Sequence, residues 1–341
     1  MIEAKMTSIV MTGGGTGGHL AIIKAVKEHL KDERLIYVGS TKGQDRQWFE
    51  NDDDFKERYF FKTQGVVNQG FIGKVKSLFL LAKATVQSIK ILHSHKATVV
   101  FCVGGFSAAP MAFAAKLTGI PLVIHEQNAA LGSLNRVLKP YAAEFISSYL
   151  DESPIKAYPI KEVFFDNARV RTAVKTIIFL GGSQGARVIN NLALQMAPKL
   201  KEKGINIIHQ AGAKNIEEVK KEYASLGIEA EVFGFTEKLA EYMHKADFAI
   251  ARSGASTLWE LSASAVPALY IPYPYAAKDH QYYNALFLVE KNLAWLMREE
   301  EIAVSKVWSI LDEDMEEISQ GLIDTVEKEG SLKIAQLLSS Y

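Results

Sequence analysis

The chain has 341 residues, and its 39 lysine and arginine residues balance 39 aspartate and glutamate residues, so the formal net charge is zero. Zero net charge excludes a protein that binds nucleic acid through bulk positive charge. The length predicts two domains, because single cores rarely grow past about 250–300 residues. The single cysteine, Cys102, excludes a disulfide framework and a cysteine-based zinc site, and it fits a reducing compartment.

Short β-branched segments alternate with helical patterns along most of the chain, which predicts parallel sheets covered by helices on both faces. The N-terminal apolar segment is too short for a signal peptide and carries Glu3, so it predicts a first buried strand. No uncharged apolar stretch reaches the length that spans a membrane. The predicted strands are 8–11, 35–38, 98–103, 122–125, 144–147, 176–180, 205–210, 231–233, 248–251 and 268–271.

An internal repeat divides the chain. The first strand runs into GGGTGGH (13–19), and the strand at 176–180 runs into GGSQGA (181–186). Each strand, glycine-rich turn and helix is expected to open its own doubly wound domain. We therefore predict an N-terminal domain over 1–158 and a C-terminal domain over 159–341, with a last helix at about 320–341 that packs back on the N-terminal domain.

The glycine-rich loops predict anion binding, because glycine lets the backbone approach an anion and the next helix supplies free N–H groups. Gly13-x-Gly15-x-x-Gly18 formally matches the dinucleotide fingerprint, but the second strand ends in Gly39-Ser40 without the carboxylate that would hold a ribose. No G-x-x-x-x-G-K-[ST] sequence occurs, so a P-loop NTPase is not favoured.

Polar residues cluster where several predicted strands end. His19 follows the first glycine loop, and a helix N-terminus disfavours the protonated imidazole, which keeps it available as a base. Gly104-Gly105 follows the third strand, and residues 125–128, His-Glu-Gln-Asn, follow the fourth. Residues 253–257 can cap a helix and offer N–H groups to a phosphate or nucleobase, with Glu260 one turn further on.

Seven segments in order resemble the MurG family of bacterial N-acetylglucosaminyltransferases. They are GGGTGGH (13–19), GGFSAAP (104–110), HEQNAALGSLNRVL (125–138), GGSQGARVIN (181–190), HQAG (209–212), ARSGASTLWEL (251–261) and DHQYYNA (279–285). The resemblance implies a GT-B fold, in which two Rossmann-like domains face each other across a cleft. It also implies a hexosyltransferase that moves GlcNAc from UDP-GlcNAc to the MurNAc 4-hydroxyl of lipid I, giving lipid II with inversion, in peptidoglycan biosynthesis and thus in cell shape and division.

The resemblance also implies roles for individual residues. In the C-terminal domain Ser183 would contact the diphosphate and the backbone at Thr236 the uracil, Glu260 would hold the ribose and Gln281 the GlcNAc, with Ala255, Ser256 and Thr257 around the nucleotide. Thr16, Gly17, Gly18 and Asn128 would complete the donor site, and His19, Glu126 and Asn128 would face the reacting centre or the acceptor. Lys161 stands where the family usually has arginine, and lysine keeps the charge but loses the bidentate fork.

These residues suggest a mechanism of single displacement at the anomeric carbon. Our hypothesis is that His19 takes the acceptor proton, with Glu126 as the second candidate. Glycine loops and helix N-termini can stabilise the departing UDP. The D-x-D triplets at 52–54 and 312–314 stand in charge runs away from the glycine-rich loops, so we expect neither a metal nor a cofactor.

A stretch from Arg58 to His125 has seven lysines and no acidic residue. Within it an apolar stripe at helical spacing (72, 75, 78, 79, 82, 86 and 89) is expected to face the core. The off-stripe Leu80 and Leu81, together with Lys74, Lys76 and Lys83, predict a contact with an anionic lipid surface. Residues 1–160 carry 19 basic and 14 acidic groups, and residues 161–341 carry 20 and 25, so a basic half and an acidic half cancel.

The expected partners are therefore UDP-GlcNAc, lipid I, an anionic membrane surface and other cell-wall synthesis proteins, with no nucleic acid. The expected location is the cytoplasmic face of the bacterial cell membrane, as a peripheral protein. Three alternatives stay open: a related UDP-sugar enzyme of the UDP-GlcNAc 2-epimerase type, a dinucleotide oxidoreductase, and a non-catalytic UDP-sugar-binding protein.

Overall fold

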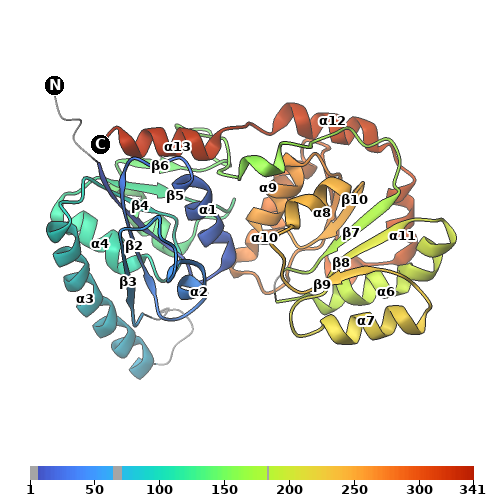
Figure 1. The fold of residues 1–341 in the computed structure, drawn as a ribbon, viewed down its shortest axis with the longest axis horizontal. Helices are drawn as coiled ribbons and strands as arrows, with labels where there is room; N and C mark the ends of the chain where they lie inside the picture. The colour runs from blue at the N-terminus through green and yellow to red at the C-terminus, as the bar shows by residue number, and fades with distance from the viewer. Residues whose placement is uncertain (1–6, 64–70, 183) are drawn as a thin grey trace. The chain divides into compact units, whose positions relative to one another are not determined.

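The structure is a computed structural model that describes residues 7–63, 71–182 and 184–341. It divides into two compact units, which are described separately below (Figure 1). The first unit is Met1–Ile160 with Glu329–Tyr341, and the second is Lys161–Lys328. The first unit ends at Ile160, two residues beyond the boundary expected at 158. Where one last helix was expected at about 320–341 there are two, Met315–Thr325 and Gly330–Ser339, and the second belongs to the first unit.

The first unit is built on a six-stranded parallel sheet in the order β3-β2-β1-β4-β5-β6. The strands are β1 (Ser8–Thr12), β2 (Arg34–Ser40), β3 (Glu57–Phe61), β4 (Val99–Cys102), β5 (Leu122–His125) and β6 (Glu144–Ile146). The order reverses between β1 and β4, so right-handed crossovers put the helices on both faces. The helices are α1 (Gly17–Lys27), α2 (Asp45–Phe49), α3 (Phe71–Ser94), α4 (Ala109–Thr118), α5 (Ser133–Leu138), η1 (Lys139–Tyr141) and α13 (Gly330–Ser339), and α13 packs on α1.

The second unit repeats the plan with the order β12-β11-β10-β7-β8-β9, again parallel. Its strands are β7 (Thr176–Leu180), β8 (Asn206–Gln210), β9 (Glu231–Phe233), β10 (Phe248–Ala251), β11 (Ala268–Tyr270) and β12 (Trp295–Leu296). Its helices are η2 (Glu162–Phe164), α6 (Arg187–Glu202), α7 (Ile216–Ser225), α8 (Leu239–Lys245), α9 (Ala255–Ala263), η3 (Ala277–Asp279), α10 (His280–Val289), η4 (Glu299–Glu301), α11 (Val304–Leu311) and α12 (Met315–Thr325).

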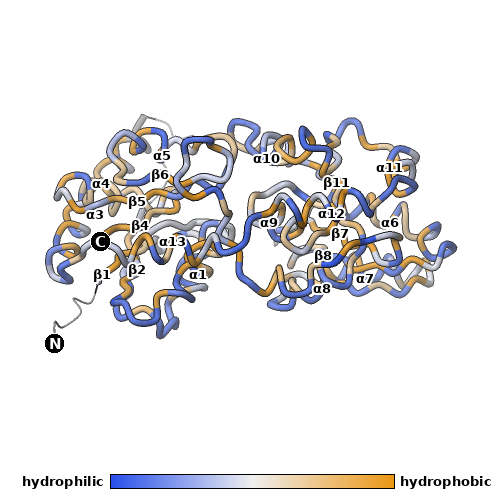
Figure 2. The backbone as a smooth tube through the Cα atoms, turned by 90° about the horizontal axis from the view of Figure 1, so that it is seen from above, coloured by the Kyte–Doolittle hydropathy of each residue, from blue (hydrophilic) through white to orange (hydrophobic). Residues whose placement is uncertain are grey.

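Burial on both faces explains why the strands of each sheet are apolar throughout. The residues of β1, β4, β5, β10 and β11 are buried along their whole length, and most strand segments are orange in Figure 2 while many connecting loops are blue. A strand covered on both faces reads as a continuous apolar run rather than an alternation. The doubly wound α/β prediction is therefore confirmed in both units.

Two strands, β3 and β12, were not predicted from the sequence, and both lie at sheet edges. β3 has a charged start, Glu57-Arg58, and its residues are only partly buried. β12 has two residues, each partly buried. Edge strands carry charge and are short, so they lack the apolar run that marked the central strands.

The expected orientation of α3 is wrong. Its exposed side chains include Val75, Leu78 and Phe79, which are 56%, 62% and 70% exposed and belong to the stripe expected in the core. The buried face instead carries small residues such as Ser77, Ala84 and Ser88. α3 packs mainly on the alanine-rich α4, and small side chains let two helices approach closely. The larger apolar residues are thereby left facing solvent.

No helix in the described part of the chain is long and apolar enough to cross a membrane.

Candidate functional site

The glycine loops of the first unit meet at the carboxyl ends of β1 and β4, where the strand order reverses and α/β sheets bind ligands. The Gly14 N–H donates to the Gly104 carbonyl over 3.3 Å. A Cβ atom on Gly105, whose φ is +82°, would lie 2.4 Å from the Gly14 carbonyl oxygen. Glycine at 105 therefore lets the two loops touch backbone to backbone.

Asp45 holds the first glycine loop in place, and it was not among the predicted site residues. The side chain is completely buried. One carboxylate oxygen accepts from the Gly15 N–H at 2.7 Å, and the other accepts from the Ser40 N–H at 2.9 Å and lies 3.2 Å from the Tyr37 hydroxyl. Because these groups occupy both oxygens, Asp45 is not a free ribose acid of a dinucleotide site. The position of Asp45, an acidic residue soon after the second strand, was the one feature of the sequence that could have pointed to it.

Asp45→Asn is expected to destabilise the first unit by about 3 kcal/mol and to lower activity. The amide would either present an N–H to the Gly15 N–H or lose the bond to Ser40, and a buried donor without an acceptor is costly. Thermal unfolding and steady-state kinetics measure both effects. Asp53→Asn is the control because the Asp53 side chain is fully exposed, and equal stability of the two variants would contradict the assignment.

His19 lies in the first turn of α1, and both of its ring nitrogens have polar neighbours. Thr16 Oγ1 lies 2.9 Å from His19 Nδ1, and the side-chain amide nitrogen of Gln127 lies 3.1 Å from His19 Nε2. An amide nitrogen only donates, so Nε2 accepts, and the neutral ring carries its proton on Nδ1 and donates to Thr16. This tautomer keeps the lone pair on Nε2, where a general base needs it.

Glu126, the second candidate base, is committed to its own loop. Its side chain is 2% exposed. One oxygen accepts from the Asn128 N–H at 3.1 Å, and the other accepts from the Gly132 N–H at 2.8 Å and from the Asn135 side-chain amide at 3.0 Å. These three bonds hold the loop after β5 in place, so the geometry favours His19 over Glu126 as the base.

His125 precedes this loop and is fully buried. Neither of its ring nitrogens has a hydrogen-bond partner among the residues that the structure describes. Burial lowers the pKa of His125 to about 3, and a protonated His19 lowers it further. His125 therefore stays neutral near physiological pH and presents no charge to the loop.

The glycine loop of the second unit follows β7 and precedes α6. A Cβ atom on Gly212, whose φ is +87°, would lie 2.4 Å from the Gly185 nitrogen, which explains the glycine of HQAG (209–212). His209 of the same segment is completely buried, with Nδ1 3.0 Å from the Tyr223 hydroxyl and Nε2 3.1 Å from Asn190 Oδ1. Burial lowers the pKa of His209 to about 4, so this histidine is a neutral core residue.

The start of α9 brings together several predicted donor residues. Gly254, which lies within the expected segment 253–257, is the N-cap, and no side-chain hydrogen bond is made at the cap. The first turn carries Ala255, Ser256 and Thr257 with their N–H groups toward the carboxyl end of β10. Glu260 lies one turn on, where burial raises its pKa to about 7 while the charge of Lys161 lowers it. The charge of Lys161 therefore favours the ionised form of Glu260, the residue predicted to bind the ribose.

The remaining predicted donor residues of the second unit lie in loops at other strand ends. Gln281, in the first turn of α10, accepts from the Tyr273 N–H at 2.9 Å and so fixes the loop after β11. Thr236 follows β9, and its hydroxyl accepts from the Lys238 N–H at 3.0 Å. Ser183 lies outside the described residues, as does the side chain of Lys74.

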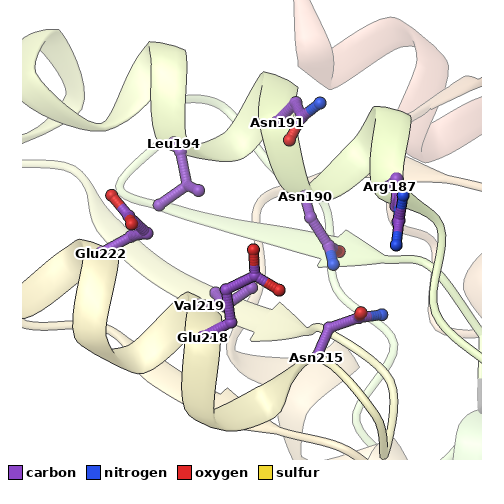
Figure 3. Close-up of a pocket in the computed structure, with 8 residues that line it drawn as sticks. All are labelled: Arg187, Asn190, Asn191, Leu194, Asn215, Glu218, Val219 and Glu222. Carbon is purple, nitrogen blue, oxygen red and sulfur yellow. The ribbon is translucent and has the colours of Figure 1, made fainter.

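A pocket of about 310 Å³ lies between α6 and α7 (Figure 3). Its polar groups come from Arg187, Asn190, Asn191, Asn215, Glu218 and Glu222. None of the predicted donor or acceptor residues lines it. In the described ranges, no group of three histidine, cysteine, aspartate or glutamate side chains is placed to hold a metal ion.

Both units match one enzyme family. Residues 9–147 match the glycosyltransferase family 28 N-terminal domain, and residues 176–338 match its C-terminal domain. A protein of Sulfurovum sp. (strain NBC37-1), named UDP-N-acetylglucosamine--N-acetylmuramyl-(pentapeptide) pyrophosphoryl-undecaprenol N-acetylglucosamine transferase, is 71% identical over 334 residues, which are 98% of this chain and 99% of that protein.

Solved structures agree with this match. The crystal structure of Acinetobacter baumannii MurG has a TM-score of 0.81 and 26% identity, and the match covers 98% of this chain and 100% of that one. UDP-GlcNAc 2-epimerase from Neisseria meningitidis, with a TM-score of 0.61 and 13% identity over 98% of this chain and 100% of that one, shares the fold alone. The chain therefore belongs to glycosyltransferase family 28 and is an N-acetylglucosaminyltransferase with the two-domain GT-B fold.

Proposed function

We propose that this transferase moves GlcNAc from UDP-GlcNAc to the 4-hydroxyl of the lipid-linked MurNAc acceptor, the reaction for which its 71% identical relative is named, with His19 as the general base. The observation that carries the proposal is the fixed imidazole at the first glycine loop, whose Nε2 lone pair is set by Thr16 and Gln127. Nε2 takes the hydroxyl proton as the oxygen bonds to the anomeric carbon. The bond from that carbon to UDP breaks, and its electron pair leaves with UDP.

The second unit binds the donor in this proposal. N–H groups at the starts of α6 and α9 meet the diphosphate and nucleotide, because a helix N-terminus carries a partial positive charge. Ser183 takes the diphosphate, Thr236 the uracil and Gln281 the sugar, as the motifs imply. Glu260 accepts from the ribose hydroxyls and Lys161 adds a positive charge beside it. Thr16, Gly17, Gly18 and Asn128 complete the donor contacts.

Incubating the full chain with UDP-GlcNAc and a soluble lipid I analogue tests the reaction. We expect disaccharide and UDP to form in equal amounts, and only when the acceptor is present. Release of UDP without the acceptor would instead indicate hydrolytic or epimerase chemistry.

Donor affinity is expected to fall as the pH drops below about 7. The ionised form of Glu260 accepts from the ribose, so donor binding weakens when the carboxylate, whose pKa is about 7, takes up a proton. The KM for UDP-GlcNAc should rise by up to roughly tenfold per pH unit below that value. Glu260→Gln should give a KM that is high and independent of pH over the same range. A pH-dependent KM in that variant would assign the effect to another group.

The membrane contact is proposed for α3. Val75, Leu78, Phe79 and Val86 leave more than half of their surface exposed on one helix face, and Lys76 and Lys83 are exposed on the same helix. Exposed apolar side chains between lysines fit the interface of an anionic bilayer. Leu80 and Leu81 are only partly exposed, so the stripe expected in the core supplies most of this surface. We propose that the chain lies on the cytoplasmic face of the membrane through this helix.

Reversing the charge of Lys74, Lys76 and Lys83 to glutamate should weaken binding to vesicles of anionic phospholipid by at least about 100-fold, at about 1 kcal/mol per lysine. Activity on a soluble acceptor analogue should be unchanged. The matched control reverses three exposed lysines of the second unit, Lys214, Lys220 and Lys221. Equal vesicle binding by the two triple variants would refute the contact.

A further inference from the structure

Gln127 is built into the first unit as a partner of His19. It follows β5, whose end is tied to β6 by the Glu126 N–H donating to the Ile146 carbonyl at 2.8 Å. The Gln127 side chain is 7% exposed, and its amide nitrogen lies 3.1 Å from His19 Nε2. The contact joins α1 to the loop after β5, two segments more than a hundred residues apart in the chain.

The other end of the same amide is unsatisfied. Gln127 Oε1 is buried and has no hydrogen-bond partner within the described ranges. A buried acceptor without a donor loses its hydrogen bonds to water and gains none in return. An amide needed only for packing would be replaced by an apolar side chain at less cost, so the unmet acceptor points to a state in which it is used.

The chemistry of the amide identifies that state. Its nitrogen donates to the unprotonated Nε2 of a neutral imidazole, and a half-turn of the amide presents Oε1, which accepts from Nε2–H. We propose that Gln127 is a positioning residue that holds His19 before and after proton transfer. The acceptor hydroxyl displaces the amide N–H from Nε2 and gives its proton to Nε2. Oε1 then accepts a hydrogen bond from the new Nε2–H. This inference rests on the proposed role of His19 as base.

The groups around His19 fit this role. Thr16 holds Nδ1 from the start of α1. His125, at the end of β5, is kept neutral by burial. The Glu126 carboxylate receives three hydrogen bonds within its own loop. A neutral amide can therefore follow the charge state of His19 without fixing its pKa far from neutrality, which a carboxylate would do.

Imidazole ¹⁵N shifts of the full chain labelled at histidine test the proposal. In the native protein the shifts of neutral His19 should be those of the Nδ1–H tautomer. Gln127→Glu should raise the pKa of His19 by about one unit or more and move the kcat–pH profile with it. Gln127→Leu, which keeps the volume, should mix the tautomers and lower kcat by about 10- to 100-fold with the donor KM unchanged.

Gln320→Glu, at an exposed glutamine of the second unit, is the control and should change neither readout. If the tautomer and the titration of His19 are the same in the native protein and in both Gln127 variants, the inference is overturned. The shifts are read without turnover, so they decide the role of Gln127 even if His19→Ala keeps full kcat and the base assignment fails.

Discussion

Replacing His19 by alanine is expected to lower kcat by about 10²- to 10⁴-fold, the range that a general base contributes. The KM for UDP-GlcNAc should change little, because the imidazole acts on the acceptor proton in the transition state. The ring is fixed through both nitrogens, so His19→Ala removes one group without removing the loop. Single-turnover kinetics with a soluble acceptor analogue separates the chemical step from donor binding.

Glu126→Gln is the informative comparison. The carboxylate receives hydrogen bonds from two backbone N–H groups and from Asn135, and an amide can accept at only one of its two ends. We expect this variant to loosen the loop, so that thermal stability falls and the KM of the acceptor rises. If Glu126→Gln instead abolishes kcat in a fully stable protein, while His19→Ala changes only KM, Glu126 is the base.

The sequence predicted the doubly wound plan well because central parallel strands must be apolar on both faces. Strands such as 176–180 and 248–251 were exact for that reason. The charged edge strand β3 was missed, and α3 was turned the wrong way. Its buried face carries Ser77 and Ser88, so the positions of its apolar residues did not indicate which face packs against the rest of the unit. The packing partner decided the orientation of that helix, and the partner could not be read from the helix's own pattern.

The candidate site was predicted as motifs rather than as contacts. His19 and Glu126 were both found, but only the bonds of the Glu126 carboxylate within its own loop distinguish their roles. Asp45 and Gln127 act through residues far from them in the chain, at Gly15 and His19. Such long-range hydrogen bonds leave no periodic pattern in a sequence. The sequence contains both residues, an acid soon after the second strand and a glutamine next to Glu126. It does not indicate which residues they contact.

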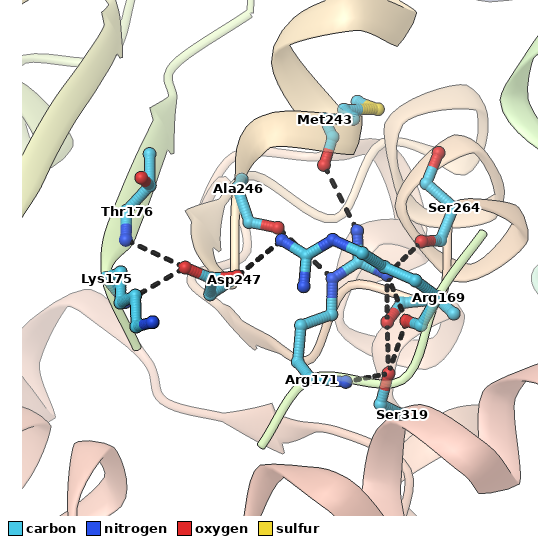
Figure 4. A network of polar contacts seen from close by, with 10 residues as sticks. Arg169, Arg171, Lys175, Thr176, Met243, Ala246, Asp247, Ser264 and Ser319 are labelled. Atoms are coloured by element: carbon cyan, nitrogen blue, oxygen red, sulfur yellow. Dashed lines mark hydrogen bonds and ion pairs between the residues drawn. The ribbon is translucent and has the colours of Figure 1, made fainter. Parts of the chain in front are cut away.

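The second unit depends on a buried arginine that no motif indicated. Arg171 is completely buried (Figure 4). Its guanidinium donates to the carbonyls of Met243 and Ala246 at the end of α8 and of Ser264 and Ala265 at the end of α9. The last carbonyls of a helix lack partners within it, and they carry partial negative charge. One side chain therefore caps two helices, and burial beside Arg169 lowers its pKa to about 10, so it stays charged.

Arg171→Met is expected to destabilise the second unit by about 3–5 kcal/mol, because at least four buried carbonyls lose a charged donor together. The melting temperature of that unit should fall by roughly 10 °C. Arg171→Lys should be intermediate, since lysine keeps the charge but has three donors at one atom. Arg169→Met is the control: its side chain is 45% exposed, and the buried Asp247 with which it pairs keeps its hydrogen bonds from the Lys175 and Thr176 N–H groups, so its loss should cost less than that of Arg171. Hydrogen exchange at the amides of α8 and α9 locates the change.

Equal melting temperatures for Arg171→Met and Arg169→Met would show that the two helix ends do not depend on Arg171. Donor binding should fail in Arg171→Met at the temperature where α9 loses protection, because Glu260 and the first-turn N–H groups lie on that helix.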